Sequence, residues 1–370
     1  MRRKGSTGDR EIRGKSATSR DLPTPPAPRP SKIRSLSAPL SAETPRVRRP
    51  VLFHAFLVLL AIVLAAALSP AIFLGCVQAS EWIPALRGVP FYRVFSRVLQ
   101  IGVILALIPA VLSLRVRHPR DVGLEKNPFG VRDLLFGFML VVILFCGFAA
   151  LALHLEAYRW RDAPDWGKMG AIVLRAGVVG TLEEIIFRGL LLGLLIKWFE
   201  RIFNSNKANP AAPWLAAGVS SVVFAAVHFF KPAKIGPAAA DVTWLSGFQQ
   251  LSTVFGADDP QFIIWGFATL FAAGLVLAFA ALRTRSLFLP IGIHAGWVLA
   301  QQTFNLAARF RVKPPEELLP WIGPNLVHGA VPTGLLPMAV LAVTSACVWI
   351  YLRFLRGSCS ARPPGSSGTT

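Results

Sequence analysis

The segment Thr181-Leu-Glu-Glu-Ile-Ile-Phe-Arg-Gly-Leu190 lies inside an apolar run that extends from Met169 to Ile196. It places two adjacent carboxylates and an arginine in a run that is long enough to span a membrane. Because one charge at the centre of a bilayer costs about 2.5–3.5 kcal/mol on insertion scales, three charges in one span need a physical reason.

Helical geometry supplies part of that reason. Glu184 and Arg188 are four residues apart, so they share a helix face and can form an ion pair. Glu183 points about 100° away and has no local partner. An unpaired carboxylate in apolar surroundings is suited to acid–base chemistry. This stretch alone leaves a second interpretation open, in which a structural ion pair faces a neighbouring helix and Glu183 lies in a wet crevice.

Composition assigns the chain to a class. Of the 370 residues, 54% are hydrophobic and only 16% are charged, and several apolar runs reach the length that spans a bilayer. We therefore predict an all-α, polytopic transmembrane helix bundle with about eight spans. We expect these spans at 51–78, 94–114, 134–153, 169–198, 213–230, 262–282, 286–304 and 331–352.

The chain divides into segments of different character. We expect a disordered, basic, Pro-rich cytoplasmic tail at 1–50, because that segment has too little apolar surface to fold. N-terminal transmembrane helices follow at 51–160 and a helical core at 168–304. The loop at 231–260 shows no sustained period and is expected to be irregular. A final transmembrane helix at 331–353 precedes a second disordered tail at 357–370.

The net charge of +20 does not indicate nucleic-acid binding. Residues 1–50 hold 13 Lys and Arg against 4 Asp and Glu, but no aromatic residue that could stack on bases. We expect this segment to contact anionic membrane lipids. Lys and Arg also follow the second, fourth, sixth and eighth spans. This distribution predicts a multi-pass protein of the plasma (inner) membrane with both termini in the cytoplasm.

Two histidines lie in other apolar spans. His228 ends Phe224-Ala-Ala-Val-His228, and His294 lies between Gly292 and Gly296, which allow close backbone approach. A lone histidine in a membrane span is usually a hydrogen-bond partner between helices. Two glutamates and two histidines on three spans are the groups that activate a water molecule, either as a general base or through a metal. The four cysteines show neither metal-ligand spacing nor a disulfide pattern.

Three motifs together carry a resemblance to a known family. Glu183-Glu184-x-x-x-Arg188, then Phe224-x-x-x-His228, then His294 on a later span, resemble the CPBP family of intramembrane proteases over residues 168–304. That family includes the CAAX prenyl endopeptidase, which acts in CAAX-box protein maturation, and bacterial homologues linked to bacteriocin self-immunity. The first motif is weak alone, but all three in this order on consecutive apolar spans are specific.

The resemblance implies an intramembrane endopeptidase, a hydrolase that cleaves a membrane-associated protein or peptide. It implies Glu183 as the base that activates water, Glu184 and Arg188 as its support, and His228 and His294 as groups that hold the water, a metal or the oxyanion. Zinc bound by Glu183, His228 and His294 and a metal-independent glutamate protease are both implied. We also expect the aromatic side chains one turn from the histidines, Phe224 and Trp297, to contact the substrate.

One position departs from the family pattern. Four residues after His294 the family commonly has Asn, and here that residue is Val298, which cannot donate a hydrogen bond to an oxyanion. Either Trp297 or Gln301 supplies the donor, or turnover is weak or absent. Loss of one oxyanion donor costs about 10²–10³ in rate. The alternative function is therefore a non-catalytic membrane immunity or scaffold protein of the same fold.

Overall fold

The computed structural model describes residues 51–113, 117–125, 128–203, 209–229, 232–234, 236–253, 260–310, 321–325 and 331–355. These residues form an all-α bundle, as the composition predicted. The two predicted tails, 1–50 and 357–370, lie outside the described residues. The longer helices are α2 (Val51–Ala79), α3 (Phe91–Ser113), α4 (Gly130–His154), α5 (Met169–Glu184), α6 (Leu192–Ile202), α7 (Ala212–Phe229), α9 (Pro260–Thr284), α10 (Phe288–Ala307) and α12 (Leu335–Ile350).

Six helices in the described part of the chain are long and apolar enough to cross a membrane. The protein is a multi-pass membrane protein. The six stretches are Leu52–Ala79, Phe91–Pro109, Gly130–His154, Ala212–Phe229, Ile263–Thr284 and Leu335–Phe354. The expected spans at 169–198 and 286–304 are helical but are not among the six. The first is divided by a π-helix that follows the 16 residues of α5, and α10 carries histidine, glutamine and asparagine side chains that make it less apolar.

The span expected at 169–198 is one helical run with a change of pitch at the motif. The α-helix α5 ends at Glu184, the π-helix η4 covers Ile185–Leu191, and α6 continues from Leu192. A π-helix bonds each N–H to the carbonyl five residues earlier, which rotates the following side chains relative to an α-helix. Such turns are rare in proteins, and those that occur are often at functional sites.

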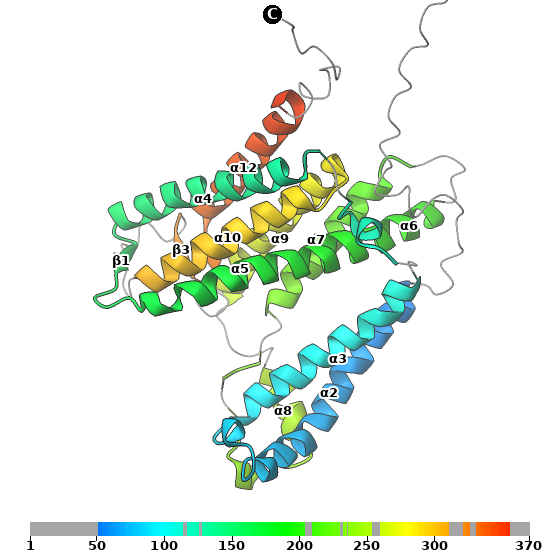
Figure 1. Ribbon diagram of the computed structural model, residues 1–370, viewed down its shortest axis with the longest axis vertical. Helices are drawn as coiled ribbons and strands as arrows, with labels where there is room; N and C mark the ends of the chain where they lie inside the picture. Colours follow the sequence, from blue (N-terminus) through cyan, green and yellow to red (C-terminus); the bar gives the residue numbers. More distant parts are fainter. Residues whose placement is uncertain are drawn as a thin grey trace, which may run out of the picture. The chain divides into compact units, whose positions relative to one another are not determined.

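The helix α10 lies between α4 and α5 (Figure 1) and packs along both. Small residues permit this close approach. A methyl group at Gly180 of α5 would lie 2.9 Å from the backbone nitrogen of Ala295, and one at Gly292 of α10 would collide with the Leu134 carbonyl of α4. A methyl group at Gly296 would lie 2.9 Å from the Phe138 carbonyl oxygen, so both glycines around His294 have the role that the sequence predicted.

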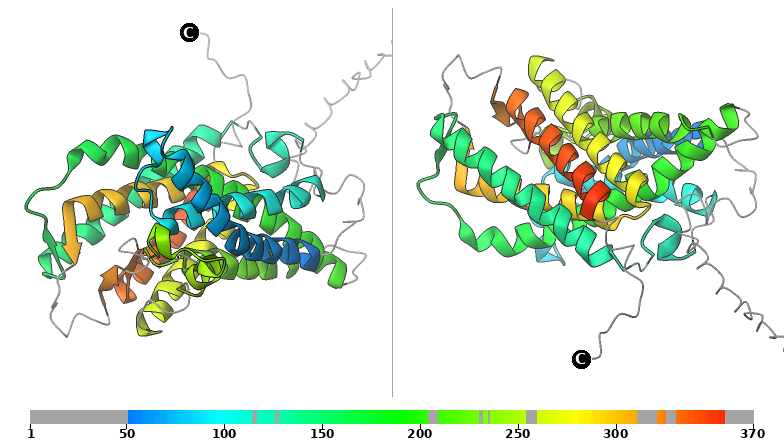
Figure 2. Two further views of the ribbon diagram at one scale, coloured as in Figure 1. Left: turned by 90° about the horizontal axis from the view of Figure 1, so that it is seen from below. Right: turned by 90° about the horizontal axis from the view of Figure 1, so that it is seen from above.

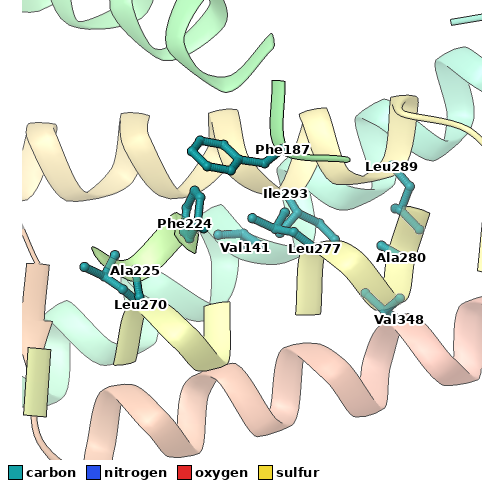
Figure 3. Packing of buried hydrophobic residues seen from close by; sticks show 10 residues of the cluster. All are labelled: Val141, Phe187, Phe224, Ala225, Leu270, Leu277, Ala280, Leu289, Ile293 and Val348. Carbon is teal, nitrogen blue, oxygen red and sulfur yellow. The ribbon is translucent and has the colours of Figure 1, made fainter. Parts of the chain in front are cut away.

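Helix α12 closes the bundle against α4 and α9. In the right-hand view of Figure 2, α12 (red) lies between α4 and α9 (yellow), the two helices that it contacts. Beneath them a cluster of buried apolar side chains joins α4, α7, α9, α10 and α12. In Figure 3 its members point toward one another, and the Phe187 ring of η4 meets the Phe224 ring of α7 edge to face at 5.2 Å. This cluster holds the motif-bearing helices in fixed register.

Several short elements were not expected from the sequence. The helix α8 (Ser246–Ser252) lies in the loop predicted to be irregular. It packs on α2 through Gly247, at which a methyl group would collide with the Ala66 carbonyl. Its helical structure therefore depends on a tertiary contact that a seven-residue pattern does not encode. Two small antiparallel sheets pair β1 (Tyr158–Trp160) with β2 (Ala308–Phe310) and β3 (Gly323–Asn325) with β4 (Val331–Thr333).

The remaining short helical elements connect the spans. The 3₁₀ segments are η1 (Pro84–Leu86), η2 (Pro119–Val122), η3 (Trp166–Lys168) and η5 (Ala239–Asp241), and a second π-helix, η8 (Tyr351–Leu355), extends α12. Burial raises the pKa of Tyr158 in β1, so this phenol stays neutral. It packs against Phe304, near the C-terminal end of α10.

Candidate active site

Three helical runs bring the predicted polar residues together. Glu183 and Glu184 end α5, Arg188 lies in η4, His228 is the penultimate residue of α7, and His294 lies in the second turn of α10. Glu184 and His294, which are 110 residues apart in the sequence, are hydrogen-bonded, and both histidines lie within 3.8 Å of Glu183.

Glu184 is the centre of a buried polar chain. Its Oε1 accepts hydrogen bonds from Arg188 Nη1 at 2.8 Å and from His294 Nδ1 at 2.7 Å. Arg188 Nη2 also donates to the Gly274 carbonyl of α9, and its guanidinium lies over the Phe224 ring at 4.4 Å. Glu184 and Arg188 are both buried, so each neutralises a charge that the apolar interior would otherwise exclude.

The Nδ1 hydrogen bonds of the two histidines fix which ring nitrogen of each faces Glu183. His294 Nδ1–H donates to the Glu184 carboxylate, and His228 Nδ1–H donates to the Phe224 carbonyl at 2.8 Å. A carbonyl oxygen can only accept, so Nδ1 of His228 carries the proton. In the neutral form of each ring, the lone pair is then on Nε2. Both Nε2 atoms lie near the same carboxylate oxygen of Glu183.

That oxygen is Glu183 Oε2. It is 3.7 Å from His294 Nε2 and 3.8 Å from His228 Nε2, too far for direct hydrogen bonds. It is buried and has no hydrogen-bond partner among the described residues. A buried carboxylate oxygen without a partner is costly, and a polar contact beyond 3.5 Å is the spacing that a bridging water occupies. The Glu183 carboxylate and the two imidazole nitrogens therefore face one another without direct hydrogen bonds.

Glu183, His228 and His294 are the side chains of this site that could bind zinc. Imidazole Nε2 atoms whose Nδ1–H groups are held by a carboxylate or a carbonyl are typical zinc ligands. In the described part of the chain, however, no group of three or more His, Cys, Asp and Glu side chains is arranged to hold a metal ion. The chemistry of the three groups suits zinc, but in this structure they do not form such a group.

A cavity of about 420 Å³ adjoins the cluster. Glu183, His228 and His294 line it together with both expected substrate-contacting residues, Phe224 and Trp297. Most of its wall is apolar and aromatic, from α4, α5, η4, α7, α9, α10 and α12; the polar exceptions outside the cluster are Arg175, Thr269, Gln301 and Gln302. Such a wall suits an apolar peptide side chain or a lipid-like group.

The sequence left one question of depth open, since His228 lies at the end of its span and His294 lies within its own. The structure brings both within 3.8 Å of Glu183 because α7 and α10 are offset along the bundle. A shift of a few residues at about 1.5 Å each is sufficient for this.

Comparison with known families gives an independent result. Residues 165–300 match the family model described as type II CAAX prenyl endopeptidase Rce1-like. By this match the segment is similar to the CAAX prenyl endopeptidases, and we call it the CAAX prenyl endopeptidase-like domain. It contains α5, η4, α6, α7, α9 and most of α10, and therefore every residue of the polar cluster. No curated protein and no solved structure matches the chain.

Sequence reasoning missed several groups of the CAAX prenyl endopeptidase-like domain. The Gly274 carbonyl accepts from Arg188, and a methyl group at Gly274 would lie 2.9 Å from Ser221 Cβ of α7. Ser220 Oγ donates to the Phe187 carbonyl inside the π-helix. Two adjacent serines in an apolar span were a visible signal of interhelical hydrogen bonding. Gly274 has no comparable signal, because its role is a backbone carbonyl.

Proposed function

We propose that the protein is an intramembrane endopeptidase that hydrolyses a peptide bond of a membrane-associated protein or peptide, with Glu183 as the general base. One observation carries this proposal. Glu183 Oε2 is buried, has no hydrogen-bond partner among the described residues, and lies under 4 Å from two imidazole nitrogens at the wall of an apolar cavity. The match to an endopeptidase family supports it.

In the proposed reaction a water molecule lies between Glu183 and the two Nε2 atoms. Glu183 takes a proton from the water as its oxygen forms a bond to the substrate carbonyl carbon, and the carbonyl oxygen becomes an oxyanion. The C–N bond then breaks, and the proton passes from Glu183 to the leaving amine. General-base assistance of this kind contributes about 10²–10⁴ in rate.

Glu184 and Arg188 act in this proposal as positioning residues. Glu184 holds the Nδ1–H of His294, so the Nε2 of that ring faces Glu183. Arg188 balances the Glu184 charge and ties it to α9 through Gly274. Neither group needs to touch the substrate. Their effect is to keep one imidazole in the correct orientation, which matters because small displacements of catalytic groups are costly in rate.

Zinc held by Glu183, His228 and His294 is the second form of the proposal, favoured by the two Nε2 atoms that lie within 3.8 Å of Glu183 Oε2. Prolonged dialysis of the purified protein against a strong chelator distinguishes the two. We expect cleavage to continue without metal, because the three groups do not converge closely enough. Cleavage that stops on chelation and returns with zinc alone would establish the zinc form.

The orientation of the chain bears on the substrate. We propose cytoplasmic termini, as the distribution of Lys and Arg predicts. The cavity then lies in the half of the membrane away from the basic loops, since it is lined by the C-terminal half of α4, the first half of the continuous run α5–η4–α6, the end of α7 and the start of α12. This placement favours a substrate in the outer half of the membrane over a prenylated cytoplasmic protein.

A non-catalytic immunity or scaffold protein is the second candidate function. The observation that favours it is Val298, an apolar residue that lines the cavity at the position where the family commonly has Asn. In that case the cavity would bind a partner segment without hydrolysing it.

The test compares protein termini in cells that carry the wild type or Glu183→Gln, with expression and membrane insertion matched. Peptide ends that occur only with the wild type would support proteolysis and identify the substrate. Glu81→Gln, a change at an exposed carboxylate after α2, is the matched control and should preserve those ends. Identical termini in wild type and Glu183→Gln would favour the scaffold function.

A further inference from the structure

Gln301 of α10 has a buried amide group that takes no part in the reaction proposed for Glu183. Its side-chain Nε2 is buried and has no hydrogen-bond partner among the described residues, and Gln301 lines the same cavity as Glu183 and His294. Buried amide donors are almost always hydrogen-bonded, because leaving one unpaired is destabilising. A donor without a protein partner at the wall of a cavity indicates that the bound ligand supplies the hydrogen-bond acceptor.

The neighbouring glutamine makes the contrast clear. Gln302 also lines the cavity, but its Oε1 accepts a hydrogen bond from Arg175 Nη1 at 3.0 Å, which ties α10 to α5. Gln302 thus has a structural partner, whereas the Nε2 of Gln301 has none in the part of the chain that the structure describes. The amide of Gln301 is the side chain of this pair that is available to a substrate.

Helical geometry directs Gln301 toward the reacting centre. At about 100° per residue, a residue seven positions after His294 returns to within about 20° of the same face. Val298 lies between them on that face, one turn closer to His294. Long side chains on a helix lean toward its N-terminus, so the Gln301 amide leans over Val298 toward His294. The amide N–H of Gln301 is thereby directed toward the region that the amide N–H of an Asn at position 298 would occupy.

We propose that Gln301 is a catalytic residue that donates a hydrogen bond to the carbonyl oxygen of the scissile bond and to the oxyanion formed from it, in place of a donor at position 298. This inference rests on the proposed peptidase function and deepens it. The chain departs from the family pattern at Val298, and the glutamine one turn further along the same face supplies the missing donor.

The experiment uses the full-length protein in detergent and an internally quenched peptide that spans the Glu183-dependent cleavage site found by the comparison of termini. We expect Gln301→Leu to lower kcat by about 10²–10³ with KM changed little, since an oxyanion donor acts mainly in the transition state. Adding Val298→Asn to Gln301→Leu should restore at least about tenfold in kcat, because it places a donor on the same face. Gln249→Leu, at an exposed glutamine of α8, is the control and should leave kcat unchanged.

The outcomes separate this inference from the proposed function. A Gln301→Leu protein that keeps kcat within about threefold of the wild type overturns the inference while the peptidase function stands. So does a loss of kcat that is accompanied by a lower unfolding temperature and is not restored by Val298→Asn, since that is a structural effect. If Glu183→Gln cleaves the peptide as fast as the wild type, the proposed function fails, and the inference fails with it.

Discussion

The helices α2 and α10 are both long and contain no Asp, Glu, Lys or Arg, yet they lie in opposite surroundings. Ten large apolar side chains of α2 are exposed, from Leu52 to Val77, and the helix is apolar enough to cross a membrane. In α10 no large apolar side chain is exposed, and the helix fails the same apolar test. It is enclosed by α4, α5 and α9.

The difference shows that different surroundings constrain the residues of an exposed helix and of an enclosed helix. The exposed residues of α2 are apolar because a polar group without a hydrogen-bond partner is costly in hydrocarbon. Neighbouring helices select the residues of α10, because they supply hydrogen bonds to His294 and leave room only for glycine at Gly292. Hydropathy therefore identifies lipid-facing helices most easily. It identifies the enclosed helices that hold the polar cluster least easily.

The largest predicted effect concerns the enclosed ion pair. Arg188→Leu leaves the Glu184 carboxylate buried without its cation, so we expect a loss of about 3–5 kcal/mol in the free energy of unfolding. Unfolding of the purified protein in mixed detergent measures it. Lys168→Leu is the control, because Lys168 and Asp165 form an ion pair in which the side chains are 67% and 58% exposed. Its loss should not exceed about 1 kcal/mol; equal losses for the two variants would contradict the comparison.

The second prediction replaces matched apolar residues. Ile293 of α10 is fully buried in the main core, whereas Leu64 of α2 is 48% exposed. Ile293→Ala leaves a cavity and should cost about 3 kcal/mol, and Leu64→Ala should cost less than about 0.5 kcal/mol. The same unfolding assay in lipid nanodiscs measures both. A large loss for Leu64→Ala would mean that another protein segment, and not lipid, covers this face of α2.

The smallest effect comes from adding one methyl group. Gly292→Ala places a methyl against the Leu134 carbonyl, so α10 must move from α4, at a cost of about 1–3 kcal/mol. Gly75→Ala in α2 meets no atom within 4 Å and should stabilise the helix by up to about 1 kcal/mol. Thermal unfolding of the two variants gives the sign of each change. Stabilisation by both would show that α10 is not held closely by α4.

The positions of the helices followed from the sequence with small errors. The expected spans at 51–78 and 213–230 correspond to α2 (Val51–Ala79) and α7 (Ala212–Phe229). Runs of about twenty apolar residues specify a membrane helix whatever surrounds it, because the backbone must satisfy its own hydrogen bonds in hydrocarbon. The helix α8 escaped prediction because its seven residues are held by packing against α2.

The sequence by itself determined the class of fold, the order of the spans and the residues Glu183, Glu184, Arg188, His228 and His294 as a candidate set. It did so because charged and imidazole groups are rare in apolar runs and therefore visible. Only the tertiary structure decided that His294 bonds to Glu184, that Glu183 Oε2 lies near two imidazole nitrogens, and that Gln301 Nε2 has no hydrogen-bond partner among the described residues whereas Gln302 Oε1 has one. These facts depend on the offset and close packing of helices distant in the chain, which a local pattern does not record.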